Sequence, residues 1–296
     1  MQAMKEPPRA AVLDVGCFSA HLMVVEGSLA RPLISHKVRL RLDQALDGAG
    51  RISRDGIDRI ACAVTEIQRE LRRVRVPAFL PFATSSVRDA TNAEQVIDGV
   101  TRRTGLELRC LSGEREARLS YTAARRWFGA DKPLAVLDVG GGTIELAVGD
   151  AKKPQYATSL PLGARTLTRS GVALSDMRSV LPGRIVKALP SDVLAEFAAG
   201  RAVGCSKVFQ QLAVLAGEPE QLRVKDLSKW IPRLAAMTPR ERAKLPGISR
   251  HRARQSLAGA VVAEALMRAT GHDVIDICPW STKEGVLIDL LREQRS

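Results

Sequence analysis

Short apolar runs alternate along the chain with longer segments that carry apolar residues at helical spacing. Runs rich in Val, Leu and Ala that end in a turn signal predict buried strands, and apolar residues three or four positions apart predict helices. Strands are predicted near residues 11–16, 21–25, 76–83, 106–111, 135–140, 144–148, 155–160 and 276–279, and residues 202–204 are expected to open the helix at 208–216. Helices are predicted near residues 55–73, 114–128, 191–199, 208–216 and 284–294, with a helix-rich stretch over residues 224–266. Strands that alternate with helices indicate an α/β fold.

An internal repeat connects the two halves of the chain. Residues 11–16 read Ala-Val-Leu-Asp-Val-Gly, and residues 135–140 read the same six letters. Each copy ends in Asp-x-Gly and precedes a second apolar run, so each copy predicts a hairpin with a glycine turn. Chance recurrence of a common strand composition is the alternative, and the shared ending and the shared following strand argue against it. We therefore expect two lobes of related fold.

Composition and charge narrow the class of protein. The 296 residues are 45% hydrophobic and 26% charged, as expected for a globular protein of more than one domain. A net charge of +13 favours polyanionic partners, and nucleic acid, an anionic membrane and inorganic polyphosphate all qualify. A host with an Arg-rich, Ala-rich composition would produce the same excess. No stretch approaches the ~18 uncharged apolar residues of a membrane span, and the first ten residues do not resemble a signal peptide.

The spacing of the cysteines indicates the redox state of the cellular compartment. The five cysteines are scattered along the chain, and none belongs to a Cys-x-x-Cys pair. This spacing predicts neither a disulfide framework nor a zinc site and fits a reducing compartment. We therefore expect a cytoplasmic protein without a membrane partner.

The strongest motif follows the second copy of the repeat and reads Asp138-Val-Gly-Gly-Gly-Thr-Ile-Glu145. Consecutive glycines allow a ligand to approach the backbone closely, and successive N–H groups in such a turn form an anion-binding concavity. The motif therefore offers Gly140, Gly141, Gly142 and Thr143 as phosphate-binding residues. Asp138 and Glu145 lie on the two strands of the hairpin, and hard carboxylate oxygens suit Mg²⁺. A glycine-rich hairpin with solvated carboxylates is the alternative.

This motif resembles the second phosphate motif of the exopolyphosphatase/guanosine pentaphosphate phosphatase (Ppx/GppA) family. Further segments resemble the family's motifs in the same order along residues 9 to 290, which is similar to the short, two-domain form of the family. These segments are Ala83-Thr-Ser-Ser-Val-Arg88-Asp-Ala, Leu111-Ser-Gly-Glu-Arg-Glu116-Ala-Arg-Leu, Ser159-Leu-Pro-Leu-Gly-Ala, Gly204-Cys-Ser-Lys207 and Ile277-Cys-Pro-Trp-Ser-Thr-Lys-Glu-Gly285. Arg115 stands where the family has the first Glu of a pair.

The resemblance implies a fold. The family belongs to the actin/Hsp70/sugar-kinase superfamily, so two ribonuclease-H-like lobes around a central cleft are expected. The expected lobes are residues 1–127 and 128–285, with a C-terminal helix over residues 286–296 that packs back on the first lobe. A homodimer is expected from the family alone.

The resemblance also implies roles for single residues. Glu116 matches the catalytic base that deprotonates the attacking water, although from the sequence alone it would be an ordinary helix-surface residue. Arg88 matches an arginine that binds phosphate oxygens in the transition state. Asp138 and Glu145, with Asp14, are the implied Mg²⁺ ligands. Lys207 is an implied phosphate contact.

The first glycine turn departs most from the family pattern Asp-x-Gly-Ser/Thr-Asn-Ser/Thr. Here it reads Asp14-Val-Gly16-Cys17-Phe18-Ser19, so Cys17 replaces a hydroxyl and Phe18 replaces an amide. The backbone N–H groups of Gly16 and Cys17 and the hydroxyl of Ser19 remain as phosphate contacts. Loss of one hydrogen bond to a developing anion costs about 2.7–4 kcal/mol of transition-state stabilisation. The departure therefore bears on turnover more than on binding.

Together these features predict an exopolyphosphatase that uses Mg²⁺ and water to release terminal phosphate from inorganic polyphosphate. A guanosine pentaphosphate phosphohydrolase acting on a (p)ppGpp-like polyanion is an alternative, as is a weakly active or non-catalytic sensor. A kinase-like ATPase is a further alternative, against which the setting of Glu116 argues. The basic run over residues 240–254 lacks interleaved aromatics, which argues against nucleic acid, and is either a solvated helix face or an extension of the anion site.

Overall fold

The computed structural model describes residues 7–129, 132–150 and 152–294. The chain divides into two units, one made of residues 1–112 and 283–296 (unit 1) and one made of residues 113–282 (unit 2). Residues 1–6, on which part of the signal-peptide prediction rests, and residues 295 and 296 of the expected final helix lie outside the described residues.

Unit 1 is built on a five-stranded sheet in the order β3-β2-β1-β4-β5. Its strands are β1 (Arg9–Val15), β2 (Ser19–Glu26), β3 (Ile34–Arg39), β4 (Ala78–Ala83) and β5 (Arg109–Cys110). Its helices are η1 (Leu42–Gln44), α1 (Arg54–Leu71), α2 (Ser85–Arg88), α3 (Ala93–Thr104) and α12 (Thr282–Glu293), of which α12 starts at the last residue of unit 2. The first three strands are antiparallel, and β4 and β5 continue the sheet in parallel with β1.

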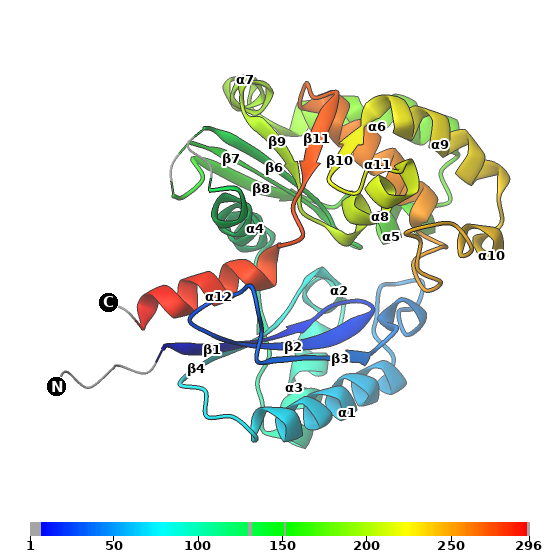
Figure 1. Cartoon of the computed structure of the whole chain (residues 1–296). Helices are drawn as coiled ribbons and strands as arrows, with labels where there is room; N and C mark the ends of the chain where they lie inside the picture. Colours follow the sequence, from blue (N-terminus) through cyan, green and yellow to red (C-terminus); the bar gives the residue numbers. More distant parts are fainter. Residues whose placement is uncertain (1–6, 130–131, 151, 295–296) are drawn as a thin grey trace. The chain divides into compact units, whose positions relative to one another are not determined.

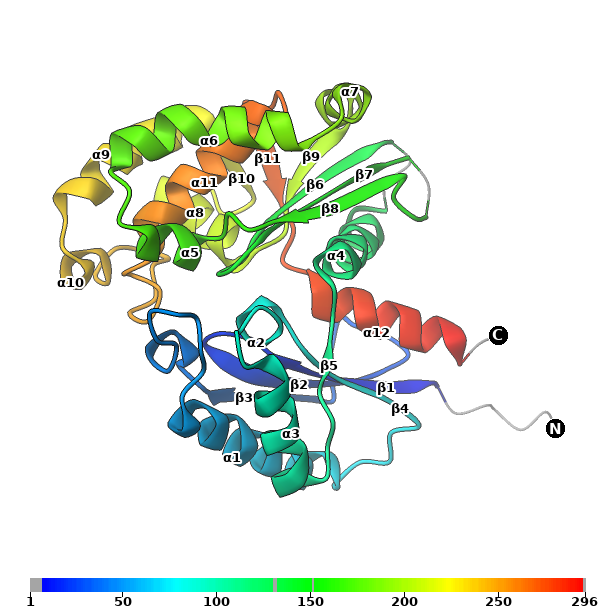
Figure 2. The same ribbon diagram turned by 180° about the vertical axis from the view of Figure 1, so that it is seen from behind.

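The alternation of side chains along β1 decides which residues face which side of this sheet. Ala11, Leu13 and Val15 belong to a core that also contains buried side chains of α1 and α3. Successive side chains of a strand point to opposite faces, so Asp14 lies on the other face. Figures 1 and 2 show α12 on that other face, while α1 and α3 cover the first.

Unit 2 is built on a six-stranded sheet in the order β10-β11-β9-β6-β7-β8. Its strands are β6 (Leu134–Val139), β7 (Ile144–Gly149), β8 (Tyr156–Leu160), β9 (Arg201–Gly204), β10 (Gln221–Arg223) and β11 (Val274–Ile277). Its helices are α4 (Gly113–Phe128), α5 (Ala164–Ser170), α6 (Leu174–Ala188), α7 (Ser191–Ala199), α8 (Lys207–Ala216), α9 (Val224–Ala236), α10 (Pro239–Arg242) and α11 (Ser256–Ala269). Helix α4 covers one face of the sheet, and α7, α8 and α11 contact the other (Figure 1).

The two sheets share one topology. Strands β6, β7 and β8 are antiparallel like β1, β2 and β3, and β9 and β11 extend the sheet in parallel beside β6. Strand β10 is an additional antiparallel edge strand. Each unit is thus a ribonuclease-H-like α/β lobe, which confirms the fold class predicted from the sequence.

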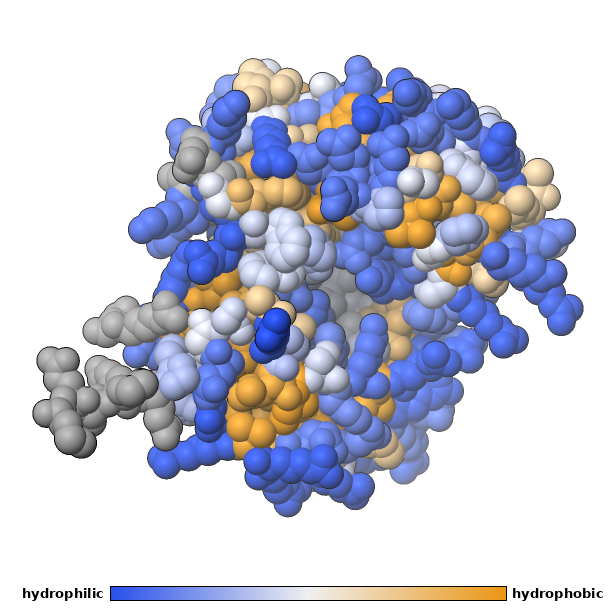
Figure 3. All heavy atoms as spheres, viewed as in Figure 1, coloured by the Kyte–Doolittle hydropathy of each residue, from blue (hydrophilic) through white to orange (hydrophobic). Residues whose placement is uncertain are grey.

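The surface in Figure 3 is mostly hydrophilic, with separate smaller hydrophobic patches. Among the described helices, none combines the length and the apolar character needed to span a bilayer.

Candidate active site

The three-glycine turn of unit 2 joins β6 to β7. The Gly140 N–H donates to the Thr143 carbonyl at 2.9 Å and closes the turn. A Cβ atom at Gly140 would lie 2.9 Å from the Thr143 oxygen, so a side chain does not fit there. The strand register pairs Asp138 with Glu145 immediately beside the turn.

The carbonyls of this turn are all bonded to the segment that starts α5. Ala164 N–H donates to Gly140 O at 3.0 Å, Arg165 N–H to Gly141 O at 2.8 Å, and Gly163 N–H to Gly142 O at 3.0 Å. Within the described part of the chain, the N–H groups of Gly141, Gly142 and Thr143 make no backbone hydrogen bond.

The three glycine carbonyls are thus used by α5, and this arrangement is compatible with the anion-binding concavity that the sequence predicts, which stays a prediction. The Arg165 side chain adds a positive charge that sequence reasoning missed. Its guanidinium is buried and would lie 3.2 Å from a Cβ at Gly141. Its signal was its place directly after the Pro-Leu-Gly-Ala segment.

Strand alternation places both candidate metal carboxylates on the face covered by α4. Leu134, Val136 and Ala147 pack in the cluster that contains α4 side chains, and Asp138 and Glu145 share their strand parity. Both carboxylates are buried, with 9% and 5% of the residue exposed. Carboxylates buried this deeply need hydrogen-bond or cation partners, and so the reading as solvated side chains of a hairpin is wrong.

A serine hydroxyl reaches each of these carboxylates. Ser120 on α4 donates to Asp138 Oδ2 at 3.2 Å. Ser159 on β8 donates to Glu145 Oε1 at 2.9 Å. The other oxygen, Glu145 Oε2, lies on the side of the turn, 3.6 Å from the position of a Cβ at Gly140.

Glu116 lies in the first turn of α4 and is also buried, with 7% exposed. It is therefore not an ordinary surface residue of the helix. Ser120 follows it by four residues, so the two side chains lie on one side of α4. Glu116 thus lies one turn of α4 from Ser120, the residue that contacts Asp138 of the carboxylate pair.

The donor set of unit 2 fits a magnesium ion. Mg²⁺ in proteins is held by one or two carboxylates and otherwise by water and phosphate oxygens. Asp138 and Glu145 supply such a pair, beside N–H groups suited to phosphate. Across the described residues, no group of three or more His, Cys, Asp or Glu side chains is arranged to hold a metal ion.

The glycine turn of unit 1 has the same backbone design. Gly16 N–H donates to Ser19 O at 3.0 Å, and the carbonyls of Cys17 and Phe18 accept from Leu42 and Leu40 at 2.7 and 2.9 Å. The side chains of Cys17 and Phe18 are buried in the hydrophobic core of unit 1. They replace the two polar groups by core packing.

The carboxylate of unit 1 has different surroundings. Asp14 pairs with His21 in the strand register, at the positions that Asp138 and Glu145 occupy in unit 2. Burial raises the pKa of Asp14 to about 6, with Lys283 opposing the rise and Glu284 adding to it. Burial and the charge of Lys283 lower the pKa of His21 to about 4. Asp14 Oδ1 is buried and has no hydrogen-bond partner among the described residues.

Two further predicted residues are engaged in local contacts. The Arg88 guanidinium, in unit 1, donates to both carboxylate oxygens of Asp89 at 2.7 and 3.1 Å and to Leu111 O at 2.9 Å. Lys207 is the first residue of α8 in unit 2, and its ammonium donates to Gln210 Oε1 at 2.6 Å.

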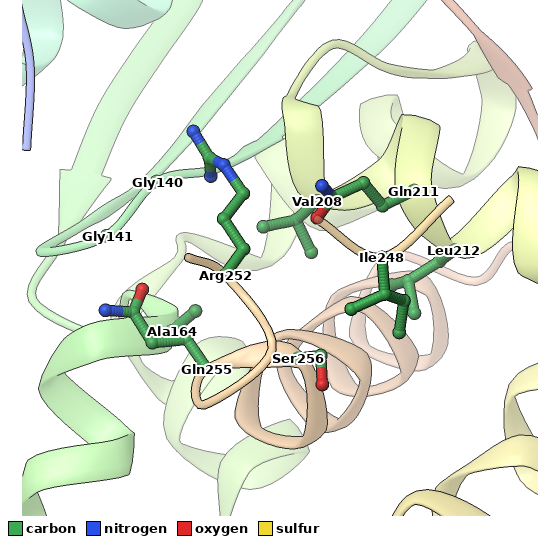
Figure 4. Close-up of a pocket in the computed structure, with 10 residues that line it drawn as sticks. All are labelled: Gly140, Gly141, Ala164, Val208, Gln211, Leu212, Ile248, Arg252, Gln255 and Ser256. Atoms are coloured by element: carbon green, nitrogen blue, oxygen red, sulfur yellow. The ribbon is translucent and has the colours of Figure 1, made fainter. Parts of the chain in front are cut away.

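A small pocket of about 20 Å³, room for about one water molecule, opens beside the three-glycine turn within unit 2 (Figure 4). Its wall includes Gly140 and Gly141, and Arg252 extends toward Gly140. The remaining lining comes from Ala164, Val208, Gln211, Leu212, Ile248, Gln255 and Ser256. Apart from Ala164, which ends the Ser159-Leu-Pro-Leu-Gly-Ala segment, these residues belong to no quoted motif, and sequence reasoning missed them.

The geometry of unit 2 agrees with the comparisons to known proteins. The model of the Ppx/GppA phosphatase family matches residues 23–294. The chain belongs to this family. An uncharacterised protein of Streptomyces coelicolor is 40% identical over 95% of this chain and 89% of its own length. Exopolyphosphatase 1 of Mycobacterium tuberculosis is 39% identical over 95% of this chain and 87% of its own length.

A solved structure supports the fold. The Ppx/GppA family member of Aquifex aeolicus superposes with a TM-score of 0.81 at 22% identity and covers 98% of this chain and 99% of its own. The resemblance stated from the motifs is therefore confirmed. The class of enzyme, a hydrolase of phosphoanhydride bonds, is confirmed with it.

Proposed function

We propose that this protein is an exopolyphosphatase that releases terminal phosphate from inorganic polyphosphate. The observation that carries the proposal is the turn of Gly140 to Thr143, in which the three glycine carbonyls accept hydrogen bonds from the start of α5, next to two buried carboxylates on the strands that the turn joins. The name of the mycobacterial relative supports the choice of substrate. The net charge of +13 favours a long polyanion.

The residues of unit 2 have different roles in the proposed reaction. The N–H groups of Gly141, Gly142 and Thr143 bind oxygens of the terminal phosphoryl group, and Asp138 and Glu145 hold Mg²⁺, which neutralises phosphate charge when bound. Glu116 accepts a proton from the attacking water. The water oxygen bonds to the terminal phosphorus, the bridging P–O bond breaks, and the products are orthophosphate and a chain one unit shorter.

The residues of unit 1 add anion contacts in this proposal. The backbone of the Gly16–Ser19 turn and the Arg88 guanidinium bind further phosphate oxygens, for which Arg88 exchanges its contact with Asp89. Lys207 of unit 2 has the same role. With Cys17 and Phe18 in the core, the turn of unit 1 has only its backbone and Ser19 for this purpose.

The test is release of phosphate from polyphosphate with Mg²⁺ by the wild type, Glu116→Gln and Glu114→Gln. Loss of a general base lowers kcat by about 10²- to 10⁴-fold, so Glu116→Gln should show this loss. Glu114 is the matched control, because it lies two residues away, is exposed and pairs with Arg118. A Glu116→Gln variant with the wild-type rate would overturn the assignment. Tight binding of polyphosphate without release by the wild type would instead favour the sensor.

A guanosine pentaphosphate phosphohydrolase is the second candidate, because a relative from Aeromonas hydrophila, 23% identical over 97% of this chain and 60% of its own length, is named a guanosine-5'-triphosphate,3'-diphosphate pyrophosphatase. The small pocket beside Gly140 and Gly141, with Val208, Leu212 and Ile248 on its wall, would have to widen to admit a base. The same assay with guanosine pentaphosphate in place of polyphosphate decides between them. A higher kcat/KM for the nucleotide would replace the first proposal by the second.

A further inference from the structure

Each candidate metal carboxylate of unit 2 accepts a hydrogen bond from a buried or half-buried serine hydroxyl to which the proposed function gives no role. Ser120 donates to Asp138 Oδ2 at 3.2 Å, and Ser159 donates to Glu145 Oε1 at 2.9 Å. We propose that Ser120 and Ser159 are positioning residues that orient Asp138 and Glu145 toward a bound Mg²⁺. This inference rests on the magnesium site of the proposed function.

The hydrogen-bond direction at Ser120 follows from the chemistry of its partners. Ser120 Oγ also lies 3.2 Å from the Thr282 hydroxyl. An ionised carboxylate only accepts hydrogen bonds, so the single proton of Ser120 goes to Asp138. The hydroxyl of Thr282 must then donate to Ser120. A directed chain therefore runs from Thr282 through Ser120 to Asp138, and each bond polarises the next.

The environment of Ser120 makes this chain of hydrogen bonds rigid. Ser120 is 1% exposed on a helix that packs against β6 and β7, and Asp138 is itself buried. Water therefore has little access to substitute for the serine hydroxyl. Without it, Asp138 Oδ2 would lose a hydrogen-bond donor in a buried setting, where an unsatisfied group is costly.

The geometry at Ser159 leads to the same arrangement. Ser159 and Glu145 are direct partners in the β7–β8 register. The hydroxyl takes Oε1, while Oε2 lies on the side of the Gly140 turn. The protein thus fixes Oε1 of Glu145, and Oε2 lies where it would reach a cation bound beside the turn. The donors also disperse negative charge of two carboxylates that are neighbours across the hairpin.

Removal of a residue that hydrogen-bonds to a metal ligand typically lowers the metal affinity by about 10- to 100-fold. We therefore expect Ser120→Ala and Ser159→Ala each to weaken Mg²⁺ binding about 10-fold or more in calorimetric titration of the full chain, without substrate. Thr282→Val should weaken Mg²⁺ binding less, because it removes only the hydroxyl that donates to Ser120. Thr282→Ser keeps a hydroxyl and should bind Mg²⁺ like the wild type. In turnover assays the Mg²⁺ concentration for half-maximal rate should rise while KM for polyphosphate stays constant.

Thr122→Val is the matched control. Thr122 lies on the same helix, and its hydroxyl donates to the Arg118 carbonyl of its own helix. Wild-type Mg²⁺ affinity in Ser120→Ala and Ser159→Ala would overturn the inference, as would an equal loss in Thr122→Val. If Ser120→Ala does not fold, as judged by its melting curve, the comparison of Thr282→Val with Thr282→Ser decides. Absence of Mg²⁺ binding by the wild type would instead refute the metal site of the proposed function.

Discussion

Replacement of Gly163 by alanine should disturb the three-glycine turn from outside it. Gly163 has φ −70° and ψ 161°, which any residue adopts, so its backbone conformation does not require glycine. The atoms around Gly163 do require glycine. An added Cβ would lie 2.4 Å from the Gly142 carbonyl carbon and 2.5 Å from both Gly141 O and Thr143 N. All three are backbone atoms of the turn and cannot swing aside as a side chain would.

The size of the effect follows from this overlap. Ordinary van der Waals contact begins at 3.4 Å, so the turn and the start of α5 must separate by about 1 Å. Overpacking of this kind costs about 1–3 kcal/mol. The separation also weakens the bonds from Gly163 and Arg165 to the turn, each contributing about 1 kcal/mol. We expect the free energy of unfolding to fall by about 3 kcal/mol, and a misplacement of 1 Å to lower the rate about 10²-fold.

Urea unfolding and phosphate release measure the two effects, with Gly183→Ala as control. A Cβ at Gly183 meets nothing within 4 Å. Because Gly183 lies inside α6, alanine should raise stability there by about 0.5–1 kcal/mol. A Gly163→Ala variant with wild-type stability and rate would refute the argument that contact with α5 shapes the anion-binding turn.

Two further predictions concern stability away from this contact. The pKa of His21 is lowered to about 4 from 6.5, so the folded state disfavours the protonated ring and the wild type loses stability as pH falls through that window. Relative to wild type, His21→Gln should therefore gain about 1–2 kcal/mol in urea unfolding at pH 4 compared with pH 7, since solvent reaches part of the ring and screens the effect, and an unchanged difference would contradict this. Thr238 caps α10 through a capping box, so Thr238→Ala should cost about 1 kcal/mol in thermal unfolding, and no shift of Tm would show that the box contributes nothing.

The sequence was most informative where hydrophobic pattern and turn chemistry agreed. The repeated six residues predicted both hairpins, β1–β2 and β6–β7, and the amphipathic segments predicted α1 and α4 within a few residues. Both hairpins are local structures, so a short stretch of sequence determines them. The sheet order depends on contacts between distant segments and was not predicted; the family resemblance implied only the ribonuclease-H-like lobes.

The missed elements have weak patterns for identifiable reasons. Strand β3 is an edge strand of Ile-Ser-His-Lys-Val-Arg in which no residue is fully buried. Helix α6 contains Pro182 and adjoining Gly183, which read as a break in a helix. Helices α3 and α5 and strands β9 and β10 were also not predicted. The strand expected at residues 106–111 is reduced to β5, and the one expected at residues 276–279 lies at β11.

The candidate site shows the same division between local and tertiary information. The glycines and carboxylates of the second hairpin follow from one motif of eight residues. Ser120 and Arg165 enter the site because α4 and α5 contact that hairpin, and only Arg165 has a local signal, its place after the Pro-Leu-Gly-Ala segment. Glu116 was assigned by resemblance, and its burial gives an independent physical reason to consider it.

The two hairpins show how one backbone design can carry opposite electrostatic preferences. In both, the glycine N–H closes the turn and the following carbonyls are bonded by the segment after the third strand. The difference lies in the residue opposite the aspartate, which is Glu145 in one hairpin and His21 in the other. Two carboxylates with serine donors favour a cation. One carboxylate beside a neutral imidazole, with Lys37 and Lys283 near enough to influence both groups, does not gather the negative charge that a divalent ion needs. The repeat thus gives both units the same turn, and positions 21 and 145 give the two turns different charges beside the shared aspartate position.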